Sequence, residues 1–230
     1  MNSTGKIIIH IPAREGSKRV PKKNIRNMAG KPMISYAIDA ALNSEVSAEI
    51  YVNTDSKDII QFVENNYQNV KIYTRNKDLA SDTATSDQFN YDIIKSLNPD
   101  TLIMVNPVCP LITSSDISEV FKTYQNSNCD TLITCEATRM QTFSCGQPVN
   151  INIDEQLRPS QDNKEIQILN WAVTIWDAKL FQERYESLGY AVMGDNRILH
   201  NIDHSKSFKV SEENDFEVCE LLLKIRKNEI

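Results

Sequence analysis

Short, uniformly apolar segments alternate with segments of helical periodicity along most of this chain. The first apolar run, residues 6–12 (KIIIHIP), ends at a proline, and similar runs recur at 48–53, 70–74, 101–105 and 131–135. Strands that are apolar at nearly every position are typical of a parallel sheet covered on both faces. Apolar residues at helical spacing lie between them, at about 33–42, 56–66, 86–97 and 114–126. The alternation therefore predicts an α/β fold with a mostly parallel sheet flanked by helices.

The alternation stops between about 137 and 168. This stretch is polar, contains Gly146, Pro148 and Pro159, and has no clear amphipathic period. Long segments without regular structure in a compact domain usually serve function or assembly. We therefore expect an excursion from the sheet that contacts substrate or a second subunit. A chain of 230 residues suits a single domain, residues 1–230, with this elaboration.

The regular pattern resumes with a core strand at 169–176 and a helix at about 177–187. The last segment places four apolar residues on one helical stripe: Val218, Leu221, Leu222 and Ile225. We expect this closing helix to pack its stripe on the sheet.

The chain is acidic, with 25 basic against 31 acidic residues and a formal net charge of -6. This balance argues against a general electrostatic grip on nucleic acid or on an anionic membrane. No apolar run approaches the roughly 18–20 residues of a membrane span, and the first residues lead straight into a strand. The five cysteines form no C-x-x-C pair, which fits reduced thiols. We therefore expect a cytoplasmic protein without nucleic-acid or membrane partners.

One loop is strongly basic in this acidic chain. Residues 13–24 (AREGSKRVPKKN) hold five cations, a glycine and a serine directly after the first strand. Gly16 lets backbone N–H groups approach a phosphate, and Ser17 can donate a hydrogen bond. The cations Arg14, Lys18 and Lys23 can neutralise the charge on a leaving pyrophosphate. A solvated basic loop is the alternative reading, but the place after the first strand favours a phosphate site.

The common phosphate-binding motifs are absent from this loop. It contains neither the P-loop pattern G-x-x-x-x-G-K-[ST] nor the dinucleotide fingerprint G-x-G-x-x-G. Ligands of open parallel sheets bind beyond the carboxyl ends of the strands, so the loops at 13–24, 54–56, 75–85 and 106–113 should line one site. Asp55 lies just past a strand end among these loops, but a plain helix N-cap is the favoured reading of this residue, because Asp is a preferred cap.

The loop sequence I-P-A-R-x-G-S-K-x-V-P-x-K-N resembles the signature of the cytidylyltransferases that activate sialic acids and Kdo as CMP-sugars. The similarity continues in the same order through segments 30–34 (GKPMI), 53–56 (NTDS), 79–84 (LASDTA), 106–111 (NPVCPL) and 214–216 (NDF). The resemblance implies a Rossmann-like fold of the nucleotide-diphospho-sugar transferase type. It also implies CTP and an acidic sugar as substrates, Mg²⁺ as a cofactor, and a homodimer in which the excursion reaches the neighbour's site.

The resemblance further implies roles for individual residues. The triphosphate would be bound by Arg14, Gly16, Ser17, Lys18 and Lys23, with Arg14 and Lys23 acting in catalysis. The cytosine and ribose would be read by Asn24, Ala80, Ser81 and Asp82.

Departures from the family pattern fall in the segments that would hold the acceptor sugar. Asn106 stands where the family usually has Gln, and it can still hydrogen-bond a sugar with a shorter reach. Arg158 and Gln161 resemble part of a family segment that approaches the substrate, although the neighbouring arginines are absent. Asn170 opens a strand that reads Asn-Gly-Ala in the family, whereas here Trp171 replaces the glycine. Asn106, Arg158, Gln161 and Asn170 are therefore the predicted substrate-binding residues.

The C-terminal departures concern the metal. Ser211 stands where the family has a magnesium-binding aspartate, and Lys209 stands at a second frequent aspartate. Magnesium prefers carboxylate oxygens and water, so the metal ligands of this chain are unknown. Three possibilities stay open: a carboxylate of Asp203, Glu212 or Glu213 takes over, Lys209 supplies charge directly, or the standard reaction is lost.

The sequence thus predicts a CTP-dependent cytidylyltransferase that activates a sialic-acid-like nine-carbon acidic sugar and releases pyrophosphate. Kdo or another acidic sugar is an alternative acceptor. A nucleotide-binding relative without turnover is an alternative of another class.

Overall fold

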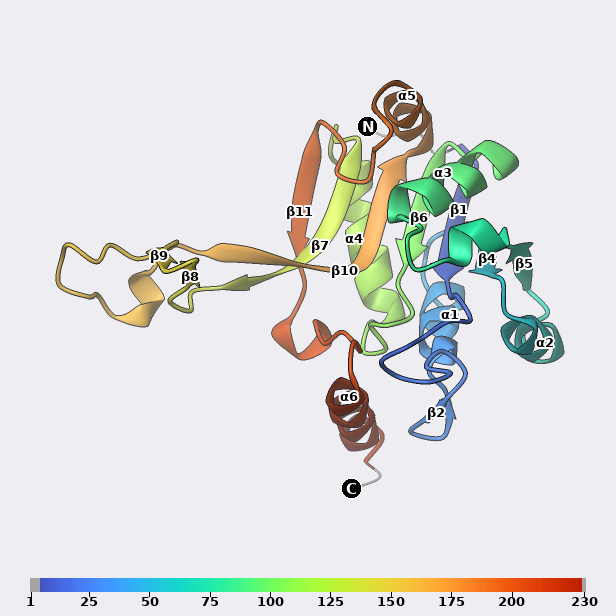
Figure 1. Cartoon of the computed structure of the whole chain (residues 1–230), viewed down its shortest axis with the longest axis horizontal. Coiled ribbons are helices and arrows are strands. Elements are labelled where there is room, and N and C mark those ends of the chain that lie inside the picture. Colours follow the sequence, from blue (N-terminus) through green and yellow to red (C-terminus); the bar gives the residue numbers. More distant parts are fainter. Residues whose placement is uncertain (1–4, 229–230) are drawn as a thin grey trace.

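The computed structural model describes residues 5–228, which are built around one central sheet of seven strands (Figure 1). From edge to edge the strands are β11 (Arg197–Asn201), β7 (Thr131–Thr138), β10 (Ile166–Asp177), β6 (Thr101–Val105), β1 (Ile7–Pro12), β4 (Glu49–Thr54) and β5 (Val70–Thr74). All six predicted strands are present, and β7 and β10 are longer than predicted. The strand β11 was not predicted, because its sequence RILHN is a half-exposed edge without a clear apolar period.

The sheet is parallel except for one strand. β1 pairs in parallel with β4 on one side and with β6 on the other. β10 runs antiparallel between β6 and β7, and β11 pairs in parallel with β7. The chain passes from β1 to β4 on one side and later returns to β6 on the other. This reversal of strand order places a crevice at the carboxyl ends of β1 and β6, where ligands of open α/β sheets bind.

Helices cover both faces of the sheet, as predicted. One face carries α1 (Ile34–Leu42), α2 (Lys57–Asn66) and α4 (Ser114–Gln125), whose apolar residues bury Ile9 and Ile11 of β1. The opposite face carries α3 (Ser86–Leu97) and α5 (Ala178–Leu188), which pack on Ile8, Leu102 and Trp176. Because successive side chains of a strand point to opposite faces, the three isoleucines at 7–9 of β1 contribute to the hydrophobic cores on both faces of the sheet. Within residues 5–228, no helix is both long and apolar enough to cross a membrane.

The excursion predicted at about 137–168 takes the form of an arm. The ends of β7 and β10 pair beyond the sheet, from Ile166 with Thr138 to Leu169 with Cys135, and carry the arm away from the body (Figure 1). The arm contains the short strands β8 (Phe143–Ser144) and β9 (Gln147–Pro148) and the 3-10 turn η2 (Ser160–Asp162). Several of its large apolar side chains are exposed: Met140, Phe143, Val149, Ile153 and Leu157.

The closing helix α6 (Glu213–Arg226) does not pack on the sheet as predicted. Phe216, Cys219 and Leu223 form its buried side, and they contact residues of the segment after β1, including Val20 and Met28. The predicted stripe lies largely on the outside, with Val218 at 41%, Leu221 at 51% and Ile225 at 51% exposure. The prediction was wrong because α6 carries apolar residues on two faces, and periodicity alone does not select between them. In its actual position α6 lies below the sheet in the view of Figure 1, on the side of the segment after β1.

Four smaller elements belong to the body. The strands β2 (Asn27–Met28) and β3 (Lys31–Pro32) form a hairpin directly ahead of α1. The 3-10 turns η1 (Lys77–Ala80) and η3 (His204–Lys206) follow β5 and β11.

Candidate active site

Two adjoining cavities open at the carboxyl ends of β1 and β6, where the fold predicts a ligand. The loop cavity has a volume of about 330 Å³ and is lined by Pro12, Arg14, Gly16, Ser17, Lys18, Arg19, Lys23, Asn24, Val108 and Ser211. The aromatic cavity has a volume of about 380 Å³ and is lined by Pro12, Arg14, Arg75, Ser86, Phe89, Met104, Asn106, Trp171, Trp176, Val192 and Lys209. Arg14 and Pro12 belong to both, so the cavities meet at the start of the basic loop.

The basic loop is held from behind by neutral and acidic groups. Asp55 accepts a hydrogen bond from the backbone N–H of Glu15 at 2.9 Å, while the cap position of α2 belongs to Ser56. Asp55 is therefore a support for the loop and not a helix cap. Asn24 is buried, and its carbonyl accepts from the N–H of Ile34 at 2.8 Å. These contacts fix the two ends of the loop. Four of its cations line the cavity, and the fifth, Lys22, pairs with Asp58 at 3.2 Å.

Arg14 joins the basic loop to the segment after η1. Its Nη1 donates to the carbonyl oxygens of Ala80 at 3.3 Å and Ser81 at 3.0 Å. The same guanidinium pairs with Asp82 at 3.0 Å, and Lys18 pairs with the other oxygen of that carboxylate. The hydrogen bond and the charge of Lys18, and to a smaller extent those of Arg14, hold the pKa of the Asp82 carboxyl below its ordinary value. The structure thus brings together the residues of these two segments that were predicted to bind the nucleotide. In this state Asp82 is ion-paired with two cations that a phosphate would need.

Lys23 lies deeper than the other loop cations. Its Nζ donates to the carbonyl oxygen of Val210 at 2.8 Å. Burial, followed by the like charges of Arg19 and Lys209, lowers the pKa of Lys23 from 10.5 to about 8. An ammonium surrounded by other cations is poised to receive an anion, because a bound phosphate would offset the repulsion that depresses its pKa.

The aromatic cavity combines an apolar wall with positive charge. Phe89, Trp171 and Trp176 lie on this wall together with Met104 and Val192. Trp176 is fixed in place, since its indole N–H donates to the carbonyl oxygen of Val192 at 2.8 Å.

The charge in the aromatic cavity includes a buried guanidinium. Arg75 is 5% exposed and lies over the ring of Phe89, with 4.6 Å from its Cζ to the ring centroid. Its Nε donates to Asn53 Oδ1 at 2.7 Å and its Nη2 to Asn53 O at 3.0 Å, both neutral acceptors. Burial lowers the pKa of Arg75 to about 10. Arg75 therefore adds positive charge to a cavity whose wall is otherwise largely apolar.

Trp171 is held in a conformation that tryptophan rarely adopts. Its φ is +59°, in the left-handed region, at an irregularity in the pairing of β10 with β7 between Leu169 and Thr174. A left-handed residue other than glycine costs about 1–2 kcal/mol, and such strain is typical of functional sites. The bulge turns the indole toward the aromatic cavity, so a position where the family usually has glycine here supplies part of its wall.

Two of the residues predicted to bind the acceptor sugar, Asn106 and Asn170, lie near the cavities, but their side chains differ in how fully they are already hydrogen-bonded. Asn106 lines the aromatic cavity, and its Oδ1 accepts only a long 3.4 Å bond from the N–H of Val108. Asn170 is buried, accepts from Thr134 Oγ1 at 2.7 Å and donates to Ser207 Oγ at 3.3 Å. Asn170 thus stabilises the bulge beside Trp171, whereas Asn106 can reach a ligand.

The other two predicted acceptor residues lie in the arm. Arg158 is exposed and pairs with Glu155 at 3.6 Å, and it lines a separate cavity of about 280 Å³ within the arm. Gln161 is exposed, and its carbonyl oxygen accepts from Arg139 at 2.8 Å. Neither residue lines the loop cavity or the aromatic cavity of its own chain.

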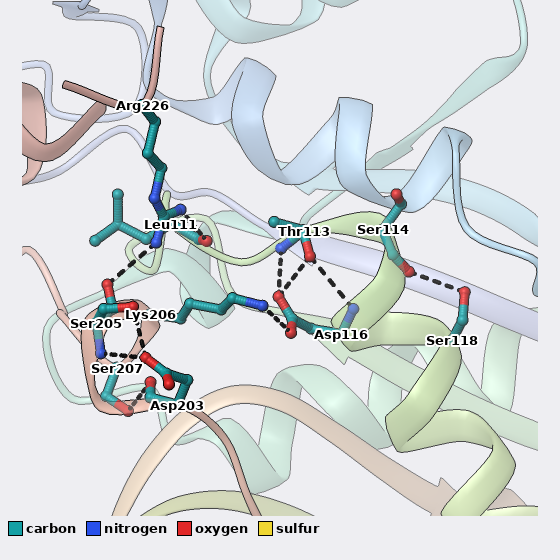
Figure 2. Close-up of polar contacts among 10 residues, drawn as sticks. All are labelled: Leu111, Thr113, Ser114, Asp116, Ser118, Asp203, Ser205, Lys206, Ser207 and Arg226. Atoms are coloured by element: carbon teal, nitrogen blue, oxygen red, sulfur yellow. Dashed lines mark hydrogen bonds and ion pairs between the residues drawn. The ribbon is translucent and has the colours of Figure 1, made fainter. Parts of the chain in front are cut away.

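The segment that carries Lys209 is anchored on both sides. Figure 2 shows Lys206 of η3 paired with Asp116 at 2.6 Å, while Asp116 also accepts from Thr113 at the start of α4. Arg226 of α6 donates to the carbonyl oxygens of Leu111 at 2.8 Å and Ser205 at 3.2 Å. Directly after Lys209, the N–H of Val210 donates to the carbonyl oxygen of Val108 at 2.8 Å. These contacts fix the backbone of Lys209 beside the cavities.

The carboxylates of this region do not fit a protein-bound Mg²⁺. Asp203 accepts from the N–H of Ser205 at 2.8 Å, and Glu213 pairs with Arg26 at 2.6 Å. The side chain of Glu212 caps the N-terminus of α6. Among residues 5–228 no group of three or more His, Cys, Asp or Glu side chains is placed to hold a metal. The three carboxylates considered from the sequence are therefore engaged elsewhere. Asp215 is also engaged at the start of α6, since its Oδ2 accepts from the N–H of Ser211 and Glu212 at 2.8 Å each.

Comparison with known proteins identifies the family. A family model described as Cytidylyltransferase matches residues 7–219. The chain belongs to the cytidylyltransferase family. This cytidylyltransferase is 30% identical, over 95% of both chains, to the post-translational flagellin modification protein B of Campylobacter coli. It is 39% identical to the CMP-N,N'-diacetyllegionaminic acid synthase of Legionella pneumophila, over 46% of its own length and 47% of that protein.

A solved structure supports the fold. The CMP:2-keto-3-deoxy-manno-octonic acid synthetase complexed with CTP superposes on the cytidylyltransferase with a TM-score of 0.72 at 17% identity, covering 96% of this chain and 99% of that one. The predicted Rossmann-like fold of the nucleotidyltransferase type is thus confirmed, and so is the prediction that the chain is a nucleotidyltransferase enzyme.

Sequence reasoning missed part of the cavity of this cytidylyltransferase. Phe89 was not predicted, and Arg75 was predicted only as part of the loop 75–85, although it directly follows the apolar run of β5 and so lies at the same sheet edge as the basic loop. Trp171 and Lys209 had been noticed only as departures from the family pattern. A cation at the carboxyl end of a parallel strand is the signal that would have singled out Arg75, whereas Phe89 in α3 and Trp171 in the antiparallel strand β10 leave no such signal.

Proposed function

We propose that this cytidylyltransferase uses CTP to activate a nine-carbon, sialic-acid-like acidic sugar that carries apolar substituents. The observation that carries the proposal is the pair of adjoining cavities, one lined by the basic loop and the other by aromatic side chains with Arg75 and Lys209. The name of the Legionella relative, a synthase of a CMP-linked diacetyl acidic sugar, supports the same acceptor class.

The loop cavity suits the triphosphate. Arg14, Lys18 and Lys23 face it together with the hydroxyl of Ser17 and the open backbone around Gly16, at which an added Cβ would meet no atom within 4 Å. Charge-assisted hydrogen bonds from such groups stabilise phosphate oxygens and the charge that develops on a leaving pyrophosphate. The backbone oxygens of Ala80 and Ser81 accept hydrogen bonds from Arg14 and so hold this segment against the basic loop, which supports a place for cytosine and ribose beside it.

In the proposed reaction the sugar hydroxyl attacks the α-phosphorus of CTP. A bond forms between the hydroxyl oxygen and the α-phosphorus, and the bond from that phosphorus to the bridging oxygen breaks. The electron pair leaves with pyrophosphate, and the hydroxyl proton is taken up by solvent. Arg14 and Lys23 stabilise the negative charge of the leaving group, which is the catalytic role proposed for them.

The aromatic cavity suits the acceptor. A sugar with only hydroxyl groups would lose water against Phe89, Trp171 and Trp176 without gaining hydrogen bonds there. An N-acyl methyl or a deoxy carbon instead gains from burial on such a wall, by about 1–3 kcal/mol for each well-packed group. Legionaminic- and pseudaminic-type sugars carry such groups, so we expect them to be preferred over Kdo.

Assembly, metal and location complete the proposal. We propose a homodimer in which the arm brings Arg158 and Gln161 to the neighbour's aromatic cavity, supported by the exposed apolar residues of the arm. Magnesium is proposed to enter bound to the phosphates of CTP. The free state of the cysteines supports a cytoplasmic location.

The test measures pyrophosphate release from CTP with Mg²⁺ across a panel of acceptors: N-acylneuraminic acid, legionaminic- and pseudaminic-type sugars, deaminated neuraminic acid and Kdo. We expect the highest kcat/KM with a legionaminic- or pseudaminic-type sugar. Trp171→Gly should lower that preference by about 10- to 100-fold while leaving the KM for CTP within about twofold, and Trp171→Phe should retain most of it.

Other results would redirect the proposal. A preference for Kdo that survives Trp171→Gly would show that the aromatic wall does not select the acceptor. Silence across the panel, with CTP still raising the melting temperature, would mean that the protein binds the nucleotide without this transfer.

A further inference from the structure

Lys209 lies where the two cavities meet. It lines the aromatic cavity together with Arg14, and Ser211, two residues later, lines the loop cavity. Lys209 is exposed, and its positive charge contributes to the lowered pKa of Lys23 on the other side of Arg14. The ammonium group is therefore electrostatically coupled to the cations of the basic loop.

No carboxylate shares this position among the residues that the structure describes. Neither the loop cavity nor the aromatic cavity is lined by an Asp or a Glu. The nearby Asp82 is paired with Arg14 and Lys18, and the carboxylates of the C-terminal segment serve as caps or ion-pair partners. A divalent cation would meet positive charge and neutral groups here, so the protein surface repels such an ion instead of binding it.

We propose that Lys209 is a catalytic residue that binds the α-phosphate of CTP and replaces a protein-bound metal ion. This inference rests on the proposed function, since it concerns the same transfer. When the acceptor oxygen bonds to the α-phosphorus, negative charge gathers on the two non-bridging oxygens. Lys209 on the acceptor side and Arg14 between the cavities are placed to stabilise that charge from two directions.

The backbone around Lys209 supports this role, because a catalytic cation must be held in position. Val210 contacts both sides of the site: its N–H donates to Val108 and its carbonyl accepts from Lys23, each at 2.8 Å. The ion pair of Lys206 with Asp116 ties the same segment to α4 (Figure 2). These three contacts hold the backbone on both sides of Lys209, so its ammonium group extends from a fixed point at the cavities.

The first test needs no acceptor sugar. Isothermal titration measures the Kd of CTP in EDTA and in Mg²⁺, and electron paramagnetic resonance measures binding of Mn²⁺ to the protein alone. We expect wild type to bind CTP in EDTA within about fivefold of its Kd in Mg²⁺, and to bind no Mn²⁺ at about 1 mM. Lys209→Ala should weaken metal-free CTP binding by about 10-fold, whereas Lys179→Ala, on the exposed face of α5, should change nothing.

The second test uses turnover with the best acceptor of the panel. Lys209→Ala should lower kcat by about 100- to 1000-fold, the loss typical of removing one group that stabilises transition-state charge, and Lys209→Arg should restore a part of it. The double variant Lys209→Asp, Ser211→Asp should bind Mn²⁺ in the absence of nucleotide. The turnover of this double variant should still increase over a range of Mg²⁺ concentrations in which the turnover of wild type has already reached its maximum.

The outcomes separate this inference from the proposed function. Two results would overturn the role of Lys209 even if a sugar is activated. One is tight Mn²⁺ binding by the wild-type protein alone. The other is that wild type and Lys209→Ala both lose CTP binding in EDTA to the same extent. A silent acceptor panel would overturn the proposed acceptors, while metal-free CTP binding that depends on Lys209 would still support the phosphate contact.

Discussion

The lowered pKa of Lys23 makes CTP binding depend on pH in a range where the nucleotide itself titrates little. With a pKa of about 8, Lys23 is about nine-tenths protonated at pH 7 and about one-tenth protonated at pH 9. Phosphate groups of this kind titrate near pH 6, so the triphosphate is already about nine-tenths ionised at pH 7, and its own titration changes the Kd far less than that of Lys23. If only the ammonium form attracts it, the Kd for CTP should rise about tenfold between pH 7 and pH 9, equivalent to about 1.4 kcal/mol.

The assay is isothermal titration of CTP at half-unit steps from pH 7 to pH 9. Lys23→Arg is the informative variant, because a guanidinium stays protonated across this range. We expect its Kd to vary by less than about twofold over the series, whatever its absolute value. A wild-type Kd that is flat with pH, or a Lys23→Arg slope equal to that of wild type, would refute the assignment of Lys23 as a phosphate-binding cation with a lowered pKa.

The same residue predicts a stability effect of known sign in the absence of ligand. The pKa of Lys23 in the folded protein, about 8, lies below the ordinary value of 10.5. The unfolded chain therefore holds the proton more tightly between these two pH values, and the free energy of unfolding due to Lys23 rises as the pH rises through this window. Relative to Lys23→Met, wild type should be least stable below pH 8 and should gain melting temperature toward pH 10.

Three further perturbations test individual contacts of the fold and the site. Asp82→Asn frees two exposed cations, so CTP should bind about 2- to 10-fold more tightly by isothermal titration, and weaker binding would show that this carboxylate contacts the nucleotide. Gly194→Ala should lower the melting temperature by several degrees, because a Cβ there collides with Thr131 and Asp130, whereas Gly189→Ala meets open space and should cost only the strain of its positive φ. Asp116→Ala should lower the free energy of unfolding by about 1–3 kcal/mol in urea denaturation. Burial raises the pKa of Asp116, but the hydrogen bonds from Lys206 and Thr113 outweigh it and hold the pKa below its ordinary value, so in wild type this contribution is present at neutral pH and is lost as the pH falls through that lowered pKa.

Most of the fold was predictable because its signal is local. The apolar strands β1 and β6 and the helices that follow them carry periodicities that survive any tertiary arrangement. The order of β10 in the sheet and its antiparallel direction were not predictable, because neither leaves a trace in the strand's own sequence. The position of α6 was missed for a related reason. The helix carries apolar residues on two faces, and the face that is buried is the one that packs on the loop containing Val20, a contact that the helix sequence alone does not reveal.

The site divides in the same way. The basic loop was recognised because its cations are adjacent in sequence, and the structure brings Arg14 to the segment of Ala80 as the resemblance implied. Arg75 and Trp171 come from strands far apart in the chain, so only the sheet order reveals that they face one cavity. The left-handed backbone of Trp171 is a tertiary property, since the bulge that imposes it depends on pairing with β7. Local patterns thus locate the phosphates, while the acceptor pocket depends on topology.

The position of β10 has a consequence for how the chain reaches its native state. β10 is the sixth of the seven sheet strands along the sequence, yet it lies between β6 and β7 and joins the two halves of the sheet. During synthesis, the edges of β6 and β7 stay open until residues 166–177 have left the ribosome, after the whole arm has been made. Unpaired strand edges are templates for association with other chains. Nascent chains that end before β10 are therefore the forms of this protein most prone to aggregate, and a chaperone would be needed there first.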